Sequence, residues 1–398
     1  MIGNLVHIEA KADTTKNAGG FMVTGGVEGV DYEYGDVVYH TQGYGNAEST
    51  SAAQPSKYGG VNNITVKALT IKTNTPLTIS TNGAVVSDCI YIQPGNDADI
   101  TLNNVKITGI LPINIPTSID HPTSAHITIA DGSENVLTTN LSATQHFPGI
   151  RCGEGSSLTI DDARRNVDIN GVPILPEGGR ISRDATLQDG TIVHQGDRLT
   201  LLDSPNAGTL KVNGGYRAAA IGGAAIENSG NMTFNGGKII ATAYGPGEGG
   251  NGAGTGIGGG HSGGGTVTTF NGGVIEAYGS YHGAGIGGGC TYVGGMSKST
   301  VTYTLTDIIM CETPKSTIAG DININGGFLK STGYTHSNAF GQGCGGTNTG
   351  KTITITGGTL LPSSQKDWYD IGGAGGDVIV TGGSIRLSGP EIGRASCR

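Results

Sequence analysis

The chain has 398 residues and a net charge of −9, and charged residues make up only 14% of it. This acidic balance gives no support for nucleic-acid binding, which needs a basic face, and the sequence has no apolar run of about 18 residues that would predict a membrane span. The 73 glycines would suggest disorder, but the regular alternation described below favours a folded chain.

Residues 1–63 are expected to form N-terminal strands, a cap and a polar insertion. Residues 20–38 predict a hairpin that caps one end of the fold, and the Ser-, Gly- and Ala-rich residues 40–60 predict a loop insertion. The first residues lack the basic and apolar regions of a secretory signal. We expect the chain to be a fragment of a longer protein, so that an export signal and an anchor lie elsewhere.

Residues 64–212 contain a series of segments in which apolar and polar residues alternate, the pattern of strands with one buried face. Turn signals such as Pro-Gly, Asp-Gly and Asn-Gly separate them. The segments are residues 64–71, 76–81, 88–95, 98–109, 125–137 and 156–171. They predict irregular coils that belong to the same architecture as the regular repeat after them.

Residues 213–390 contain a repeat marked by an x-Gly-Gly turn. The turns begin at Asn213, Asn235, Asn271, Asn325, Thr356 and Thr381. Apolar residues lie one and three positions before nearly every turn, as Phe234 and Met232 do, and again four positions after it, as Ile239 does. Each unit therefore predicts a strand, a tight glycine turn and a second strand. The Asn213 turn lies so close to the following marker that its unit is expected to lack the second strand.

A second marker, Ile-Gly-Gly, follows most units, and Phe340-Gly-Gln-Gly replaces it once. Constant strands with variable loops are typical of a solenoid, in which stacked units bury a continuous core. The predicted fold class is therefore all-β, a right-handed parallel β-helix. A propeller needs four strands in a blade of about 40 residues, and collagen needs glycine at every third position. The Gly-x-Gly strings are not nucleotide-binding loops, because no predicted helix follows them.

The cysteines Cys89, Cys152, Cys290, Cys311 and Cys344 are widely spaced and predict neither a disulfide framework nor a zinc site. We expect them to be small buried hydrophobic residues. Cys290 and Cys344 each follow a glycine cluster, and such positions can meet between successive coils. Residues 391–398, EIGRASCR, are similar to a translated sequencing adapter, and we expect them to be an artefact.

Several blocks in chain order carry a family resemblance. They include FMVTGGVEGVDYEY, HITIADGSENVL, FPGIRCGEGSSLTI and NGGVIEAYGSYHGAGIGGG. From residue 20 to 390 the chain resembles secreted surface repeat proteins of Gram-positive bacteria, which are similar to carbohydrate-binding β-helix proteins with a pectate-lyase-like fold. The resemblance implies an extracellular location on a bacterial cell surface, with a polysaccharide or a host cell-surface glycan as the partner.

The candidate carbohydrate-binding residues are aromatic residues that follow the second strand of successive units. They are Tyr244, Tyr278, Tyr281, Tyr334, Trp368 and Tyr369. In stacked coils such positions form an edge, and exposed aromatic faces can lie against sugar rings. The alternative is that these rings pack on the corner beneath them. His282 and His336 share a register and could bind a metal, although solvated loop histidines are the simpler interpretation.

For an enzyme the candidates are charged clusters. Asp161, Asp162, Arg164 and Arg165 form the densest cluster, and Asp97 and Asp99 form another. A glycosidase needs a pair of carboxylates, but no ladder of carboxylates runs through the repeats. No catalytic and no metal-binding residue is therefore assigned. No cofactor is expected, although calcium bound by loop oxygens is possible.

Three functions follow as alternatives. The first is a surface adhesin or glycan-binding module that uses the loop aromatics. The second is a structural stalk without a ligand. The third is a polysaccharide lyase or glycoside hydrolase. Whatever the function, the loops between the regular strands are expected to carry it.

Overall fold

The structure is a computed structural model that describes residues 14–42, 61–116, 122–140, 146–163, 206–245, 253–290, 318–388 and 395–397 and, with short gaps, residues 168–198. Small gaps also fall at residues 226, 335, 365–367 and 374. The described residues form strands and connections and include no helix. In this part of the chain, therefore, no helix could cross a membrane.

Nearly all strands belong to three long sheets, here called A, B and C. Sheet A contains β1 (Thr15–Ala18), β2 (Phe21–Thr24), β5 (Leu77–Ser80), β8 (Asp97–Leu102), β11 (Ser124–Ile129), β14 (Ser157–Asp162), β21 (Asn231–Phe234), β24 (Val267–Phe270), β27 (Asp321–Ile324), β30 (Thr352–Ile355), β33 (Asp377–Val380) and β35 (Ala395–Cys397). Sheet B contains β3 (Tyr32–Gln42), β4 (Val61–Ile71), β7 (Cys89–Ile92), β10 (Ile113–Ile115), β13 (Ile150–Cys152), β20 (Ile221–Gly222), β23 (Ile257–Gly258), β26 (Ile286–Gly287), β29 (Phe340–Gly341) and β32 (Ile371–Gly372). Sheet C contains β6 (Val85–Val86), β9 (Lys106–Gly109), β12 (Glu134–Thr139), β19 (Thr209–Asn213), β22 (Lys238–Thr242), β25 (Val274–Tyr278), β28 (Phe328–Thr332), β31 (Thr359–Ser363) and β34 (Ser384–Ile385).

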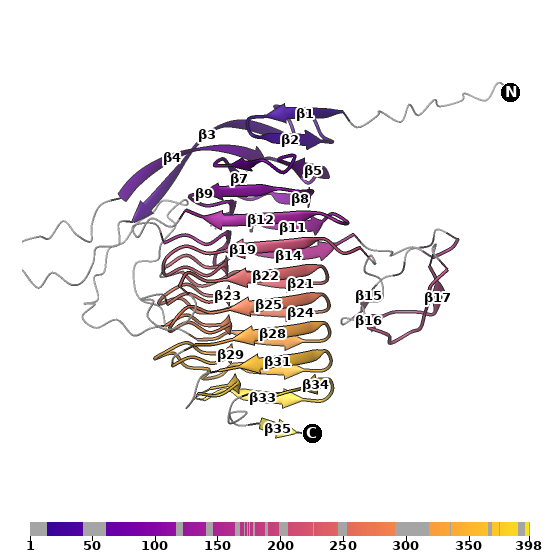
Figure 1. The fold of residues 1–398 in the computed structure, drawn as a ribbon, viewed down its shortest axis with the longest axis vertical. Helices are drawn as coiled ribbons and strands as arrows, with labels where there is room; N and C mark the ends of the chain where they lie inside the picture. The colour runs from indigo at the N-terminus through magenta and orange to yellow at the C-terminus, as the bar shows by residue number, and fades with distance from the viewer. Residues whose placement is uncertain are drawn as a thin grey trace, which may run out of the picture.

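From β5 to β34, apart from the segment between β14 and β19, the chain passes through the sheets in a fixed order, first A, then C, then B. We call one such pass a tier; β21, β22 and β23 make one. Each strand pairs in parallel with its equivalents in the neighbouring tiers, as β22 does with β19 and β25. The tiers therefore stack in sequence order from the N-terminal to the C-terminal end (Figure 1). The antiparallel pairs within these sheets lie at the N-terminal end, where β1, β2 and β5 and the long pair β3 and β4 begin the stack.

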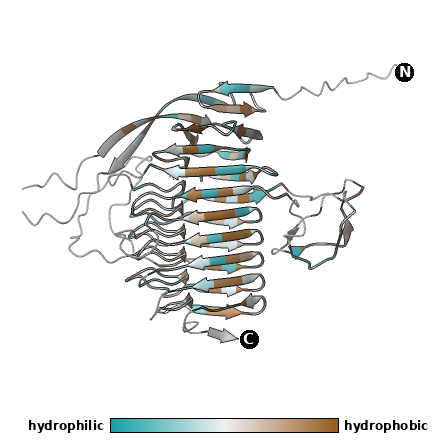
Figure 2. Ribbon diagram, in the orientation of Figure 1, coloured by the Kyte–Doolittle hydropathy of each residue, from teal (hydrophilic) through white to brown (hydrophobic). Residues whose placement is uncertain are grey.

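Columns of apolar side chains fill the space between the sheets. In sheet A, one column places equivalent residues of successive strands directly in register. Its members, all fully buried, are Ile100, Ile127, Ile160, Phe234, Phe270, Ile324 and Ile355. Phe234 and Phe270 stack with ring centroids 5.0 Å apart. Hydrophobic residues thus recur at matching places along successive strands (Figure 2), and burying each one contributes about 1.5–3 kcal/mol.

The predicted strand–turn–strand unit is confirmed, and its glycine turn joins sheet A to sheet C. We call this turn the A–C corner. In Asn235-Gly-Gly the turn connects β21 to β22, and the asparagines of successive turns are hydrogen-bonded to one another. Asn271 Nδ2 donates to Asn235 Oδ1 at 2.9 Å, and Asn325 Nδ2 donates to Asn271 Oδ1 at 2.9 Å. The side-chain amides of successive tiers therefore form a ladder of their own along the A–C corner.

The second marker is itself a strand. Ile-Gly forms β20, β23, β26 and β32, and Phe340-Gly341 forms β29, all in sheet B. The glycine adopts a φ of +132° at Gly287 and +136° at Gly258, a conformation that other residues resist. A Cβ on Gly287 would lie only 2.0 Å from the Gly341 oxygen of the next tier. Both the backbone and the stacking thus require glycine at this position.

The interpretation of the Asn213 turn was wrong. Residues 209–213 form β19 in sheet C, where Leu210 pairs with Ile239 and not with Met232 of sheet A. The first strand of this tier is β14, and the segment 163–208 separates the two. The tier therefore has both strands. Asn213 imitates an A–C corner in sequence, but it ends a strand of sheet C.

The N-terminal hairpin also differs from the prediction. Residues 20–38 do not pair with one another as a hairpin, because β2 pairs with β1 and β5 whereas β3 pairs with β4. Residues 43–60, most of the expected polar loop, lie outside the described residues. Between β14 and β19, two short antiparallel pairs project from the side of the stack (Figure 1). They are β15 (Pro176–Glu177) with β16 (Arg180–Ile181) and β17 (Ala185–Thr186) with β18 (Ile192–Val193).

Candidate functional site

Most predicted aromatic residues lie where the chain leaves sheet C for sheet B, here called the C–B corner. Tyr244 follows β22, Tyr281 follows β25, Tyr334 follows β28, and Trp368 and Tyr369 follow β31. Because the tiers are in register, these corners lie above one another along the stack. The structure thereby brings residues far apart in sequence to one edge.

A first group of rings contains Tyr244. Its ring meets Tyr216 of the preceding tier edge to face, with centroids 5.6 Å apart. Tyr216 in turn lies 5.5 Å from His146, and the Arg217 guanidinium lies 5.1 Å from the Tyr216 ring centroid. Both tyrosines are half-buried, so part of each ring contacts the corner and part faces solvent.

A second group extends over three tiers. Tyr281 packs against His282 at 4.3 Å, and His282 stacks on His336 of the next tier at 5.9 Å. His336 then meets Trp368 of the tier beyond at 6.1 Å, where Trp368 Nε1 donates to His336 Nδ1 at 3.3 Å. We call these four residues the ring line. The histidine register expected from the sequence is present, and each histidine here contacts aromatic neighbours.

Of the remaining predicted residues, Tyr369 and Tyr334 lie at C–B corners, whereas Tyr278 does not. Tyr369 is 41% exposed at the same corner. Tyr334 is half-buried, and this burial raises the pKa of its hydroxyl. Tyr278 lies elsewhere, at the end of β25 on the outer face of sheet C, where its hydroxyl donates to Glu276 and the Lys330 ammonium lies 5.3 Å from its ring centroid.

Buried histidines lie behind this edge. Burial lowers the pKa of His146 to about 4 and, more strongly, that of His261 to about 3, so both imidazoles are neutral at pH 7. His146 is bonded to the Tyr216 carbonyl at 3.0 Å, and the backbone NH of His261 donates to the Arg217 carbonyl. Within the described residues, no group of three or more His, Cys, Asp or Glu side chains could hold a metal ion.

Tyr216 was missed by the sequence reasoning, and the cause is the register error at Asn213. If Asn213 is placed at the end of a sheet C strand, Tyr216 falls at a C–B corner, as Tyr244 and Tyr281 do. The repeat itself contained the signal. It was hidden because the segment 163–208 separates β19 from the strand that precedes it in the tier.

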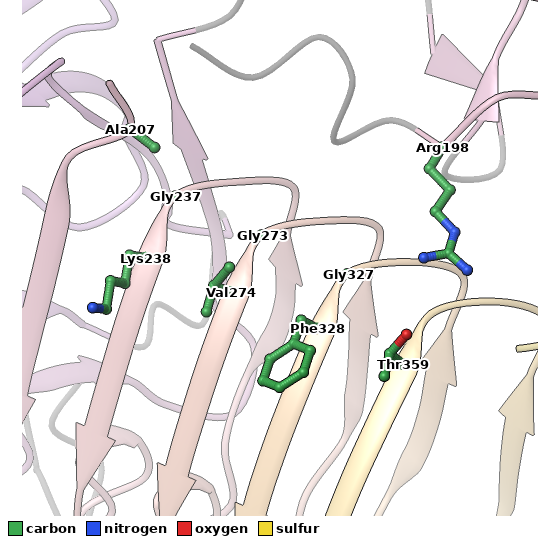
Figure 3. A pocket seen from close by; sticks show the side chains of 9 residues that line it. All are labelled: Arg198, Ala207, Gly237, Lys238, Gly273, Val274, Gly327, Phe328 and Thr359. Atoms are coloured by element: carbon green, nitrogen blue, oxygen red, sulfur yellow. The ribbon is translucent and has the colours of Figure 1, made fainter. Parts of the chain in front are cut away.

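A second surface, also missed, is a groove of about 420 Å³ beside the A–C corner (Figure 3). Its floor is formed by the first residues of successive sheet C strands and the glycines before them, and the segment 163–208 contributes Arg198 and Ala207. Val274 is 41% exposed and Phe328 is 38% exposed. The lining contains two cationic side chains, Arg198 and Lys238, and no carboxylate from the described residues.

Of the charged residues named as enzyme candidates, Asp97, Asp99 and Asp161 lie on the outer face of sheet A. His126 lies between two carboxylates, with Nδ1 3.4 Å from Asp99 and Nε2 3.8 Å from Asp161. Contact with Asp161 and the charge of Asp99 raise the pKa of His126. Asp97 accepts a hydrogen bond from Ser124, and Asp162 is buried. Arg164 and Arg165 lie outside the described residues.

Comparison of the chain with protein-family models, with curated proteins and with solved structures finds no match. The functional argument therefore depends on the residues of this chain and their geometry.

Proposed function

We propose that the chain is a right-handed parallel β-helix that binds an extended glycan along its C–B corners. We place it outside the cell, on a bacterial surface, as an adhesin or glycan-binding protein. The observation that carries the proposal is the ring line, in which Tyr281, His282, His336 and Trp368 are in continuous contact across three tiers. A row of rings at one edge matches an elongated ligand with repeated apolar faces better than it matches a small molecule.

Ring chemistry supports a sugar as the ligand. Aromatic faces pack against the apolar C–H faces of sugar rings, and their polar tips reach hydroxyl groups. Half-buried rings held by neighbours lose little conformational entropy on binding. Trp368 is fixed by His336, and Tyr281 is fixed by His282. The site is therefore largely preformed.

The groove beside the A–C corner is a second contact surface for the same function. Arg198 and Lys238 supply positive charge, and Phe328 supplies an exposed apolar face. We propose that it prefers acidic saccharides, because a carboxylate on the ligand would pair with Arg198. A preference for acidic ligands would distinguish binding in the groove from binding along the ring line, which carries no charge when its histidines are unprotonated.

The test is binding of the purified chain to a glycan array, followed by affinity measurement with the best ligand. We expect Trp368→Ala with Tyr281→Ala to weaken binding about tenfold or more, since each ring contact is worth about 0.5–1.5 kcal/mol. Tyr278→Ala is the matched control, because this tyrosine lies on sheet C away from the ring line, and it should leave the affinity unchanged. Arg198→Ala should weaken only acidic ligands.

Three outcomes would contradict the proposal. If the folded chain bound no glycan, the stalk function would be favoured. If it bound glycans with the same affinity after loss of both rings, the site would lie elsewhere. If it released reducing or unsaturated ends from polysaccharides, and His126→Gln abolished that release, the enzyme alternative would replace it.

A further inference from the structure

Cys290 and Cys344 occupy equivalent positions in adjacent tiers. Ile286 pairs with Phe340 and Gly287 with Gly341, and both cysteines follow their glycine at the same interval. The backbones remain stacked beyond the strands, because Gly288 N donates to Gly341 O at 2.9 Å and a Cβ on Gly343 would lie 2.7 Å from the Gly289 carbonyl carbon. The cysteines are thus one tier apart.

This separation suits a disulfide. Adjacent strands lie about 4.8 Å apart, and disulfides join Cα atoms about 4.4–6.8 Å apart. The backbone around Cys290 is fixed: its NH donates to the Ala253 carbonyl at 3.0 Å and its carbonyl accepts from Ser262 N at 2.9 Å. Cys344 N donates to the His282 carbonyl at 3.0 Å. Backbone hydrogen bonds therefore fix the positions of both cysteines in adjacent tiers.

The Cys344 thiol also differs chemically from the thiols of Cys89 and Cys152. The Cys344 thiol is hydrogen-bonded to Cys290, and this contact lowers the pKa of Cys344 to about 7. Burial instead raises the pKa of Cys89 to about 11 and that of Cys152 to about 12. Cys344 is partly exposed, whereas Cys290 is buried. Cys344 is therefore a reachable thiolate with a buried thiol beside it, the arrangement of an attacking and a resolving cysteine.

We propose that Cys290 and Cys344 are an oxidation site at which a disulfide cross-links the tier of β26 to the tier of β29. The oxidant is a low-molecular-weight disulfide such as oxidised glutathione. The Cys344 thiolate attacks one sulfur of the oxidant, a mixed disulfide forms, and one thiolate leaves. Cys290 loses its proton to solvent and attacks the Cys344 sulfur, and the second thiolate leaves. Two protein thiols are oxidised and one small disulfide is reduced to two thiols.

The cross-link has a structural consequence. It joins two residues between which β27, β28 and β29 lie in the sequence, and it fixes two tiers to each other by a covalent bond. Closing a long loop lowers the entropy of the unfolded chain. The bond forms next to the ring line, since Cys344 N is bonded to the His282 carbonyl.

The test uses the full chain incubated with oxidised glutathione, then digested without reduction and examined by mass spectrometry. We expect a linked pair of peptides that contain Cys290 and Cys344. We also expect iodoacetamide to label Cys344 at pH 7 about a hundredfold faster than Cys152, because only the thiolate reacts. The comparison variant is Cys311→Ser, which removes the cysteine that lies between these two in the sequence and should leave the link intact.

Two further variants assign the roles. Cys290→Ser should leave Cys344 trapped as a stable mixed disulfide with glutathione, and Cys344→Ser should leave Cys290 unmodified. The proposal would be overturned if the chain with both cysteines kept the mixed disulfide, or if Cys344 linked to Cys311 instead. Equal labelling rates at Cys344 and Cys152 would also overturn it.

Discussion

At the scale of single residues, the most consequential polar contact is the buried ion pair between Arg151 and Glu227. The Glu227 carboxylate accepts from Arg151 Nε at 3.0 Å and from Ala224 N at 2.9 Å, and Asn114 accepts from Arg151 Nη1 at 3.1 Å. Both charged side chains are at most 5% exposed. The guanidinium therefore depends on partners that water cannot replace.

We predict that Glu227→Gln lowers the free energy of unfolding by about 3–5 kcal/mol, because it leaves a buried guanidinium without its counter-charge. Urea denaturation followed by circular dichroism measures the loss. Adding Arg151→Met should recover part of it, since the double variant has no buried charge at this pair and the amide oxygen introduced at position 227 still accepts from Ala224 N. A loss below about 1 kcal/mol, the range of exposed ion pairs, would contradict the prediction.

His126 gives a pH-dependent prediction. Asp161 and Asp99 raise its pKa above the ordinary 6.5 in the folded chain. The stabilisation from this contact is therefore complete below pH 6.5 and is lost as the pH rises through the folded pKa. The melting temperature of the wild type should exceed that of His126→Gln more at about pH 5.5 than at about pH 8.5. Parallel melting curves for the two chains across this range would rule out the contact.

At the scale of elements, sheet B contains a column of glycines that leaves no room for a side chain between tiers. Gly222, Gly258, Gly287 and Gly341 all have positive φ, and a Cβ on any of them would lie 2.0 Å from the glycine carbonyl oxygen of the next tier. The column is therefore intolerant of any side chain, even a methyl group.

We predict that Gly287→Ala destabilises the chain by at least about 2 kcal/mol, the cost of a strained backbone conformation, with the clash adding to it. Thermal melting measures the effect. Gly35→Ala is the control, because Gly35 lies in β3 with nothing within 4 Å of an added Cβ, and it should change the melting temperature little. Equal effects of the two substitutions would show that packing in the column is looser than its geometry requires.

The same elements show what the sequence could and could not predict. Alternation of residues such as Met232 and Phe234 predicted buried strand faces, because the period of two is a local property. Sheet membership is not local. Residues 209–213 have the pattern of either sheet A or sheet C, and only their pairing with β12 and β22 decides. The ring line was predictable in part, since Tyr281 and Trp368 both follow a second strand, but His282 and His336 gained their significance only from contacts between tiers.

The groove could be predicted only in part. Lys238, Val274 and Phe328 occupy equivalent outward positions of the repeat, so their alignment follows from the sequence. Arg198, however, comes from a segment without a repeat pattern. Arg180 of the same segment reaches the corner of a later tier, where its Nη2 lies 3.7 Å from the place of a Cβ on Gly357. Contacts of this kind depend on the folded path of the segment.

At the scale of the whole molecule, the segment 163–208 is an addition to a stack that is complete without it. Ile160 pairs with Phe234 and Thr209 pairs with Lys238. The connection from Ile160 to Thr209, without residues 163–207, is therefore equivalent to the connection from Phe234 to Lys238. In this alignment Asp161, Asp162 and Gly208 correspond to Asn235, Gly236 and Gly237. The segment also buries its own small cluster of Ile174, Ile181, Leu187 and Val193.

We predict that deletion of residues 163–207 with Asp162→Gly leaves the stack folded. The new junction, Asp161-Gly-Gly, reproduces the A–C corner of the next tier, and β14 and β19 keep their ladders to the strands on both sides. Because stability in stacked architectures is close to a sum of contacts between neighbouring units, circular dichroism and the melting temperature should change little. The shortened chain lacks Arg198 and Ala207, so it should lose the preference for acidic saccharides while keeping binding that depends on Trp368. An unfolded or aggregated product would show instead that the segment is needed to hold the corner; retained preference for acidic ligands would exclude the groove from binding.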